Sequence, residues 1–385
     1  MRKICFITGS RAEYGLLRGL MNAVQNDPAL ELQVVATNMH LSPEFGLTYR
    51  EIEKDGFNIN KKIEMLLSSD SAQGISKSVG LGMIGFADAF SELSPDLIVI
   101  LGDRYEMLAV AFVALFHKIP IAHLHGGEIT EGAYDDCIRH AISKMSHLHF
   151  TSTEVYRKRV IQLGEQPDRV FNVGAIGIDN IKHIPLMSKE ELEQSLNFSL
   201  GDKFIVVTYH PVTLEDNSAE KQSQALISAL NALDGYKILF TYPNSDSNGR
   251  IIIDHIKEFV AAQPRKVKAW KSLGIRRYLS ALRYAKAVVG NSSSGIIEVP
   301  SFHIPTLNIG IRQKGRISAN SVFNCEATEK SIKEGLAIIL DDDFSTNVKN
   351  NNPYEGENTT EKIVDVIKNY PLANLVEKKF YDLSQ

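Results

Sequence analysis

Short, almost wholly apolar runs alternate along this sequence with longer segments of helical periodicity. The runs span residues 3–9, 32–38, 96–103, 120–127, 148–153, 204–210, 237–244, 287–293 and 305–310. Strands that are apolar along their whole length belong to parallel sheets whose two faces are covered by helices. The pattern therefore predicts an α/β fold.

The chain has 385 residues, of which 44% are hydrophobic and 23% charged. It is long enough for two domains, and this composition excludes a disordered or fibrous protein.

A polar segment from about residue 183 to residue 203 interrupts the alternation before a new apolar run begins. We place the domain boundary in this segment. We expect an N-terminal Rossmann-like domain of residues 1–185, a C-terminal Rossmann-like domain of residues 186–365, and a tail of residues 366–385. Open α/β sheets bind ligands beyond the carboxyl ends of their strands. The polar residues that follow each apolar run are therefore the candidates for function.

Charge and cysteine content limit the partners of the chain. Its 42 basic and 46 acidic side chains give a formal net charge of -4, which favours no nucleic acid as a partner. The three cysteines form no CxxC pair, so we expect neither a disulfide framework nor a thiolate zinc site, but a reducing cytoplasm. The longest apolar stretch, residues 107–116, is far shorter than the roughly 20 residues of a membrane span. We expect a soluble cytoplasmic protein.

The segment GNSSSGIIEVP, residues 290–300, is the best candidate for an anion site. Ser292 and Ser293 follow a predicted strand and open a predicted helix, where hydroxyls, backbone N–H groups and the helix dipole favour a phosphate. Glu298 lies one to two turns further on and could accept hydrogen bonds from a ribose diol. The alternative is a serine-rich helix cap followed by a solvated glutamate.

Further polar residues stand at other predicted strand ends. Arg11 and Arg312 could each bind a phosphate or face solvent. His210 precedes a proline at a strand end and could act as a phosphate ligand or as an acid or base. Asn244 and Asp246 follow the next strand. The chain has neither a GxGxxG nor a GxxxxGK[ST] motif, so a redox dinucleotide or a P-loop triphosphate site is disfavoured and no cofactor is expected.

Carboxylates gather at the ends of the third and fourth predicted strands. Asp103 ends one predicted strand, and Glu128 follows two glycines after the next. Asp135 opens a predicted helix, where it either complements the helix N-terminus or takes part in acid–base chemistry on a sugar. His125 shares one strand face with His123, a spacing that metals use, but no third ligand is evident and we expect no metal site.

Taken together, these motifs resemble those of a known family. GSRAEYG, GDRYE, HLHGGE, DDCIRHAISKMSHLH, YHPVT, PNSD, GNSSSGIIEV and IRQKGR follow one another in an order similar to that of the UDP-N-acetylglucosamine 2-epimerase family. The resemblance runs from about residue 3 to residue 365. It is nearest to the hydrolysing branch, which makes N-acetylmannosamine for sialic acid synthesis.

The resemblance implies two Rossmann-like domains of the glycosyltransferase-B type with a cleft between them. It also implies that UDP is held mainly by the C-terminal domain, that no redox cofactor is needed, and that the protein is a homo-oligomer. A dimer through the N-terminal domain, or a dimer of such dimers, is expected.

The resemblance also assigns roles to individual residues. It places the diphosphate and ribose on Ser292, Ser293 and Glu298, further nucleotide contacts on Arg11 and Arg312, and an active-site histidine at His210. The acid–base carboxylates become Asp103, Glu128 and Asp135. Many members carry a glutamate where this chain has His125, and one extra residue separates that position from Asp135 here. Either Glu128 or His125 can therefore take the role of base.

The predicted reaction is the conversion of UDP-N-acetylglucosamine and water to N-acetylmannosamine and UDP. It proceeds by anti elimination of UDP and hydration of the resulting 2-acetamidoglucal. One alternative is the same reaction on a nucleotide-linked 2,4-diacetamido-2,4,6-trideoxy sugar of legionaminic acid synthesis. Others are a sugar transferase of the same fold and a non-catalytic UDP-sugar sensor. A transferase needs an acceptor before it releases UDP, and a sensor releases none.

Overall fold

The computed structural model describes residues 1–67, 69, 71–215, 218–243, 248–341, 343–344 and 351–383. The chain forms two compact units. Unit 1 comprises Met1–Glu128, Asp135–Asn180 and Tyr354–Gln385, and unit 2 comprises Ile129–Tyr134 and Ile181–Pro353. The change of unit at residues 180 and 181 lies close to the boundary expected at 185. The sequence did not indicate that the chain returns to unit 1 from Tyr354 onward.

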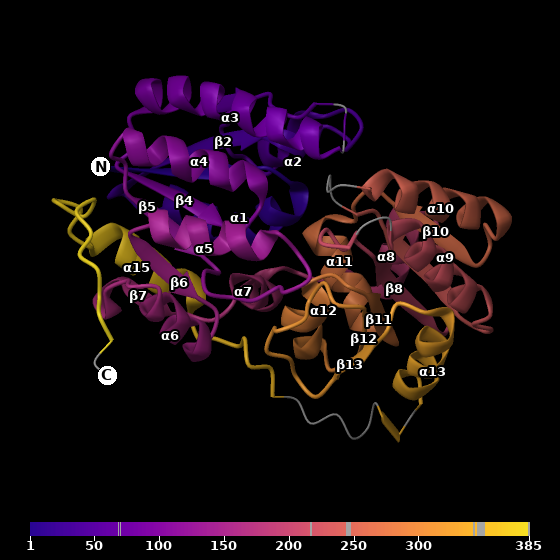
Figure 1. Ribbon diagram of the computed structural model, residues 1–385. Coiled ribbons are helices and arrows are strands. Elements are labelled where there is room, and N and C mark those ends of the chain that lie inside the picture. The colour runs from indigo at the N-terminus through magenta and orange to yellow at the C-terminus, as the bar shows by residue number, and fades with distance from the viewer. Residues whose placement is uncertain are drawn as a thin grey trace. The chain divides into compact units, whose positions relative to one another are not determined.

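Unit 1 contains a seven-stranded parallel sheet in the order β3-β2-β1-β4-β5-β6-β7. Its strands are β1 (Arg2–Thr8), β2 (Leu30–Thr37), β3 (Lys61–Ile63), β4 (Leu97–Leu101), β5 (Ile121–Leu124), β6 (Leu148–Thr151) and β7 (Val170–Asn172). Its helices are α1 (Arg11–Gln25), η1 (Asn38–Leu41), α2 (Tyr49–Lys54), α3 (Ala72–Leu93), α4 (Tyr105–Phe116), α5 (Asp135–Met145), α6 (Glu154–Gln162), η2 (Pro167–Arg169), α7 (Ile176–His183) and α15 (Thr359–Asn369). The C-terminal helix α15, yellow in Figure 1, packs against α1.

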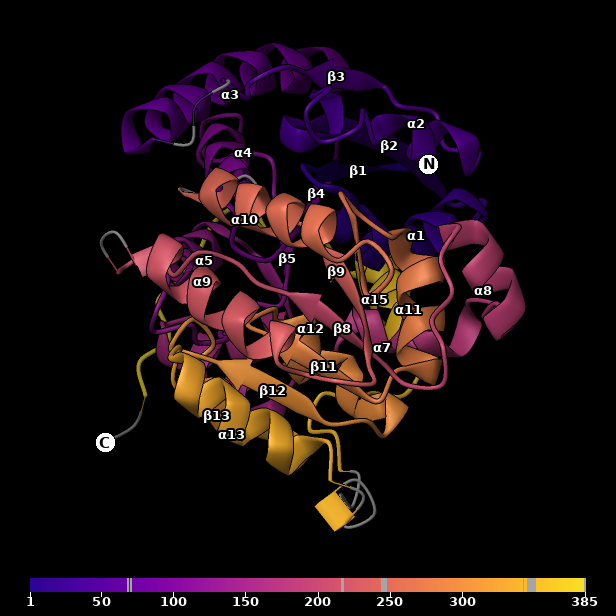
Figure 2. The same ribbon diagram turned by 90° about the vertical axis from the view of Figure 1, so that its right-hand side faces the viewer.

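Unit 2 contains a six-stranded parallel sheet in the order β10-β9-β8-β11-β12-β13. Figure 2 labels β8, β9, β11, β12 and β13 of this sheet. Its strands are β8 (Phe204–Thr208), β9 (Lys237–Thr241), β10 (Val267–Trp270), β11 (Ala287–Gly290), β12 (Thr306–Ile309) and β13 (Val322–Cys325). Its helices are α8 (Lys189–Leu196), α9 (Ser218–Asn231), α10 (Gly249–Ala262), α11 (Gly274–Tyr284), α12 (Ser294–Ile297), η3 (Val299–Phe302) and α13 (Glu329–Ile339). Helix α9 contacts both α10 and α13. The two parallel sheets confirm the predicted α/β fold.

The central strands are buried on both faces, as their apolar sequences require. In β1, Ile4 and Phe6 pack into one hydrophobic cluster, whereas Cys5 and Ile7 pack into another on the opposite face. Successive strand side chains point to opposite faces, so an uninterrupted apolar run supplies two cores at once. Strand β8 of unit 2 does the same with its own two clusters.

All three cysteines are free thiols, with Cys5 buried and Cys137 exposed. In the part of the chain that the structure describes, no helix has the length and apolar character needed to cross a bilayer.

Candidate active site

The strand order of each unit reverses beside its first strand, and the candidate residues follow the strands at these two places. In unit 1, Arg11 follows β1 and Asp103 follows the neighbouring β4. In unit 2, His210 follows β8 and Ser292 follows the neighbouring β11. A reversal of strand order opens a crevice at the carboxyl ends, which is where ligands of this fold class bind.

Arg139 organises the carboxylates of unit 1. This arginine of α5 is buried, with 1% of its side chain exposed. Its Nη2 donates to Asp103 Oδ2, and its Nη1 donates to the backbone carbonyl of Glu128 at 2.8 Å. Nη1 also lies 3.3 Å from Asp136 Oδ1. A planar guanidinium fixes the direction of each of these contacts, so Asp103 and the start of the Glu128 loop are held relative to α5.

Glu128 is a buried carboxylate with two close donors. Its Oε1 accepts a hydrogen bond from Ser152 Oγ at 2.8 Å and lies 3.2 Å from His125 Nδ1. The backbone N–H of Ile176 donates to His125 Nε2 at 3.4 Å. Because Nε2 accepts this hydrogen bond, Nδ1 is the nitrogen that can donate to Glu128. His125 therefore orients Glu128 in this structure.

The backbone of His125 is unusual. Its φ angle is 65°, in the left-handed region that side chains other than glycine adopt only when their surroundings hold them there. Its N–H donates to the carbonyl of Phe150 at 2.8 Å. This conformation turns the imidazole toward Glu128.

Asp135 is the first residue of α5 and is half-buried. Its neighbour Asp136 lies between two basic groups of the same helix, Arg139 and His140, whose Nε2 is 3.6 Å from Asp136 Oδ2. Asp136 thus contacts the residues three and four positions further along the helix.

His123 is a buried support rather than a metal ligand. Its Nε2 lies 2.7 Å from the carbonyl oxygen of Gly102, and its Nδ1 lies 3.2 Å from Ser143 Oγ. Burial lowers the pKa of His123 to about 3, so the ring is neutral and Nε2–H donates to Gly102, the residue before Asp103. Among the described residues, no group of three His, Cys, Asp or Glu side chains could hold a metal ion.

A second pair of acids lies at the ends of β1 and β4. Glu13 accepts from the N–H of Gly9 at 2.6 Å, and Glu106 accepts from Arg104 Nε at 2.6 Å. A Cβ atom on Gly9 would lie 2.3 Å from Glu106 Oε1, so only glycine lets the two acids approach. Burial, and then the charge of Glu106, raises the pKa of Glu13 to about 8. Glu13 is therefore an uncharged acid at neutral pH.

Arg11 is already engaged within unit 1. Its Nε lies 2.5 Å from Glu51 Oε2 of α2, and 19% of its side chain is exposed. A phosphate ligand at this position would have to compete with Glu51 or share the guanidinium with it.

In unit 2, Asn291 joins the ends of β8 and β11. Its Oδ1 accepts the backbone N–H of His210 at 2.7 Å, and its Nδ2 donates to the carbonyl of His210 at 2.8 Å. The asparagine is fully buried, and His210 is 6% exposed. Both backbone groups of His210 are thus fixed by one side chain.

The serine turn lies directly after β11. Ser292 and Ser293 are partly buried, and Ser293 precedes α12, which has only four residues and passes into η3. The helix that the sequence predicted after the serines is therefore short. Glu298 stands at the junction of α12 and η3 and is 6% exposed. At the start of the turn, Gly290 has a φ angle of 136°, and a Cβ there would lie 1.9 Å from the carbonyl oxygen of Thr208.

Arg312 reaches the same turn from the loop after β12. Its Nη1 donates to the carbonyl of Asn291 at 3.2 Å, and Gln313 Nε2 donates to the same oxygen at 2.9 Å. Arg312 Nε is buried and has no hydrogen-bond partner among the described residues. A guanidinium with an unused donor beside two serines is a fitting arrangement for an anion. Asn244 and Asp246 lie outside the described residues.

A family model described as UDP-N-acetylglucosamine 2-epimerase matches residues 22–368. The chain belongs to the UDP-N-acetylglucosamine 2-epimerase family. A Campylobacter jejuni GDP/UDP-N,N'-diacetylbacillosamine 2-epimerase (hydrolyzing) is 45% identical over 384 residues, which are 99% of each chain. An Escherichia coli polysialic acid biosynthesis protein P7 is 40% identical over 388 residues, 100% of this chain and 98% of the relative.

A solved S. aureus MnaA–UDP co-structure covers 100% of each chain with a TM-score of 0.81 and 18% identity. It confirms the glycosyltransferase-B type of fold for this epimerase family member. The family and these relatives make the chain a hydrolysing nucleotide-sugar 2-epimerase.

Some residues of the candidate site were not singled out from the sequence. Arg139 is one of them. One signal was available, because Arg139 shares a helix face with the apolar Ile142 three residues later and both are buried. Asn291, Glu13 and Glu106 carried no such signal, since their burial depends on strands that are distant in sequence.

Proposed function

We propose that this chain acts on a nucleoside-diphosphate-linked 2,4-diacetamido-2,4,6-trideoxy sugar, the alternative substrate of the sequence analysis. One observation carries the proposal: the 45% identity to a diacetylbacillosamine 2-epimerase over 99% of both chains. The reaction yields the free 2-epimeric sugar and the nucleoside diphosphate. The diacetamido sugar nucleotide replaces UDP-N-acetylglucosamine as our first choice of substrate.

UDP-N-acetylglucosamine is the second candidate. The polysialic acid biosynthesis protein P7 is 40% identical over the whole chain. The hydrolysing branch that the motifs resemble supplies N-acetylmannosamine to sialic acid synthesis, so this relative favours the donor without the second acetamido group.

A comparison of the two donors tests the choice. We expect kcat/KM for the diacetamido donor to exceed that for UDP-N-acetylglucosamine by about 100-fold or more. A site that hydrogen-bonds the second acetamido group keeps buried polar groups without partners when the donor lacks that group. Nucleoside diphosphate release without an acceptor is the readout. Equal values, or a preference for UDP-N-acetylglucosamine, would reject the proposed substrate.

We assign nucleotide binding to residues of unit 2 and proton transfer to residues of unit 1. Unit 2 holds the nucleotide through Ser292, Ser293, Glu298 and Arg312. In unit 1, Glu128 takes the proton from C2 while the C1–O bond breaks and the diphosphate departs. Water then adds to C1 of the glycal, and a second carboxylate, Asp103 or Asp135, returns a proton to C2 on the opposite face.

The orientation of Glu128 supports its role as the base. Its carboxylate accepts a hydrogen bond from Ser152 Oγ and lies 3.2 Å from His125 Nδ1. Asp103 is instead paired with the Arg139 guanidinium, and a full positive charge makes a carboxylate a weaker base. The role left open between Glu128 and His125 is therefore assigned to Glu128.

We also propose that the protein forms a homodimer through α3 and α4 of unit 1, which pack against each other. Leu81 and Ile84 of α3 are 43% and 66% exposed. Phe112, Leu115 and Phe116 of α4 are 43%, 47% and 68% exposed. Exposed apolar side chains gathered on neighbouring helices are typical of a protein–protein interface, and the family resemblance places the dimer contact in the N-terminal domain.

A further inference from the structure

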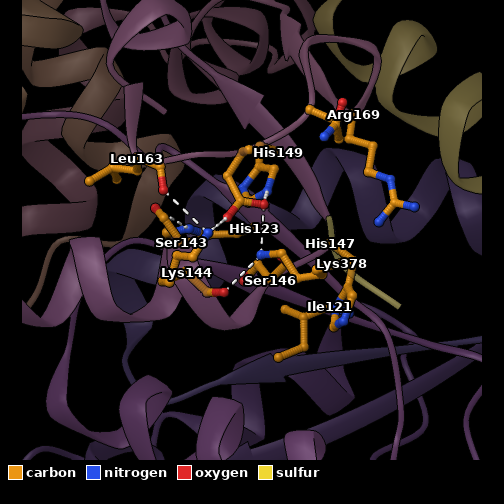
Figure 3. A network of polar contacts seen from close by, with 12 residues as sticks. Ile121, His123, Ser143, Lys144, Ser146, His147, His149, Leu163, Arg169 and Lys378 are labelled. Carbon is orange, nitrogen blue, oxygen red and sulfur yellow. Dashed lines mark hydrogen bonds and ion pairs between the residues drawn. The ribbon is translucent and has the colours of Figure 1, made fainter. Parts of the chain in front are cut away.

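A cluster of polar and charged side chains around the buried Glu165 in unit 1 has no part in the proposed reaction. Glu165 is 1% exposed and follows α6. Its Oε1 accepts from Lys144 Nζ at 2.8 Å, and its Oε2 lies 2.6 Å from Lys378 Nζ and 3.1 Å from His149 Nε2. Figure 3 shows Lys144, His149 and Lys378 in this network. We call these four residues the Glu165 cluster.

Lys378 links the cluster to the end of α5. Besides Glu165, its ammonium donates to the backbone carbonyls of Lys144 at 2.7 Å and Ser146 at 2.6 Å. These carbonyls belong to the last turn of α5 and the residue after it. A cation at a helix C-terminus satisfies carbonyls that have no partner within the helix and complements the helix dipole. All three N–H bonds of the ammonium are thus used.

The segment that carries Lys378, residues 371–383, is fastened along the surface of unit 1. We call it the C-terminal strap. Tyr381 N–H donates to the Gly164 carbonyl at 2.9 Å, and Arg169 Nη1 donates to the Leu375 carbonyl at 3.0 Å. The Phe380 ring lies against Gly164, where a Cβ would come within 2.3 Å of it. Leu375 is buried in the core.

The charges of the cluster depend on one another. Burial alone would raise the pKa of Glu165, but the hydrogen bonds from His149 and Lys144 and the charge of Lys378 lower it to about 2. His149 is fully buried, which lowers its pKa, and its Nδ1 has no hydrogen-bond partner among the described residues. It is therefore a neutral donor to Glu165.

The ammonium group of Lys378 has a lowered pKa. Burial lowers its pKa to about 8, while Glu165 acts in the opposite direction. The other charged or titratable groups around it are Lys144 of α5, Arg169 of η2, and His147 and His149 at β6. A neutral amine has two N–H bonds for three acceptors and no charge to balance Glu165.

Helix α5 connects this cluster to the candidate active site. Arg139 lies on α5 and holds Asp103 and the Glu128 loop. Ser143 of the same helix contacts His123, which in turn contacts Gly102 beside Asp103. A displacement at the C-terminal end of α5 would therefore move the groups that orient both carboxylates.

We propose that Lys378 is a positioning residue: by holding the last carbonyls of α5 to Glu165, the C-terminal strap keeps Arg139 and the carboxylates that it orients in place. The expected change in kcat rests on the proposed function. The expected change in the position and hydrogen exchange of α5 does not.

The test compares Lys378→Met and Lys378→Arg with the matched control Lys379→Met, at an exposed neighbouring lysine. Lys378→Met should lower kcat by about 10- to 100-fold, as small misplacements of a catalytic constellation do, with KM little changed. Amide hydrogen exchange in residues 140–147 should become faster in Lys378→Met and stay unchanged in Lys379→Met.

The pH profile supplies a readout that a purely structural role would not move. Wild-type kcat should fall as the pH rises through about 8, where Lys378 loses its proton. Lys378→Arg remains charged and should keep most of the wild-type kcat without that fall.

Unchanged exchange and kcat in Lys378→Met would overturn the proposal. An alkaline fall as large in Lys378→Arg as in the wild type would also overturn it, because Glu13, whose pKa is about 8, titrates in both proteins. If the wild type turns over neither donor, the proposed function is wrong. Hydrogen exchange then still tests whether Lys378 holds the C-terminal end of α5.

Discussion

At the scale of single residues, the proposed mechanism requires that Glu128, and not its neighbour His125, takes the proton from C2. Glu128→Gln removes the carboxylate but keeps its shape, so we expect kcat to fall by about 100-fold or more with nucleotide affinity largely kept. His125→Asn, which suits the left-handed backbone of that position, should lose less. Glu131→Gln at an exposed residue paired with Lys314 is the control. Steady-state kinetics and nucleotide titration measure both effects, and an active Glu128→Gln with a dead His125→Asn would reverse the assignment.

Glu13 gives the protein a stability that depends on pH. Its pKa is raised from 4.5 to about 8 in the folded state. Its contribution to stability is complete below the unfolded pKa of 4.5 and is lost as the pH rises toward and through 8. Glu13→Gln should therefore raise the melting temperature relative to the wild type at pH 9 and much less at pH 5. Thermal melts over this range, with exposed Glu258→Gln as the control, check it. Parallel curves for the wild type and Glu13→Gln would contradict the assignment of a neutral Glu13.

The sequence could place most candidate residues but not their hydrogen bonds. Asp103, His125 and Glu128 were placed at strand ends because apolar runs stop there. The tautomer of His125 depends on the backbone N–H of Ile176, 51 positions away in the chain. No local pattern encodes such a contact.

At the scale of elements, the nine apolar runs all form strands. The four strands that the sequence did not indicate are β3, β7, β10 and β13, and each is the outermost strand of its sheet. They have three or four residues and are only partly buried. An edge strand has one neighbour and less apolar contact, so its sequence need not be apolar throughout.

The end of β11 offers a test of the serine turn. Gly290→Ala would place a Cβ 1.9 Å from the Thr208 carbonyl at a φ angle of 136°. We expect it to destabilise the protein by about 2 kcal/mol or more, because neither overpacking nor the backbone angle can be relieved without moving β8. Gly80→Ala in α3, where a Cβ meets no atom within 4 Å, should be neutral or stabilising. Urea unfolding measures the difference, and equal stability of the two variants would contradict the close approach of β11 to β8.

At the scale of the whole molecule, the sequence predicted two Rossmann-like halves and their approximate boundary. It did not predict that Tyr354–Gln385 belongs to unit 1. Helix α15 packs on α1, and Arg2 donates to the carbonyl of Ile367. Contacts between the two ends of a chain leave no periodic pattern in the sequence. The sequence therefore predicted a tail at residues 366–385.

The proposed dimer is a prediction at this scale. Phe116→Asp places a charge on the apolar face of α3 and α4, and desolvating it in an interface is costly. We expect the wild type to have the mass of a dimer at micromolar concentration and Phe116→Asp that of a monomer. Light scattering coupled to size exclusion measures both. Leu214→Asp, at a 59% exposed leucine of unit 2, should leave the mass unchanged. A monomeric wild type would reject the interface.

The fate of the hydrogen at C2 tests the central claim, that this member of the family releases its nucleotide by elimination and then hydrates the glycal. With the diacetamido donor in D₂O, the free sugar should carry one deuterium at C2 and have the inverted configuration there, and it should form in equal amount to the nucleoside diphosphate. Nuclear magnetic resonance of the product reads all three. A product that keeps its original hydrogen and configuration at C2 would mean plain hydrolysis of the donor and would contradict the account.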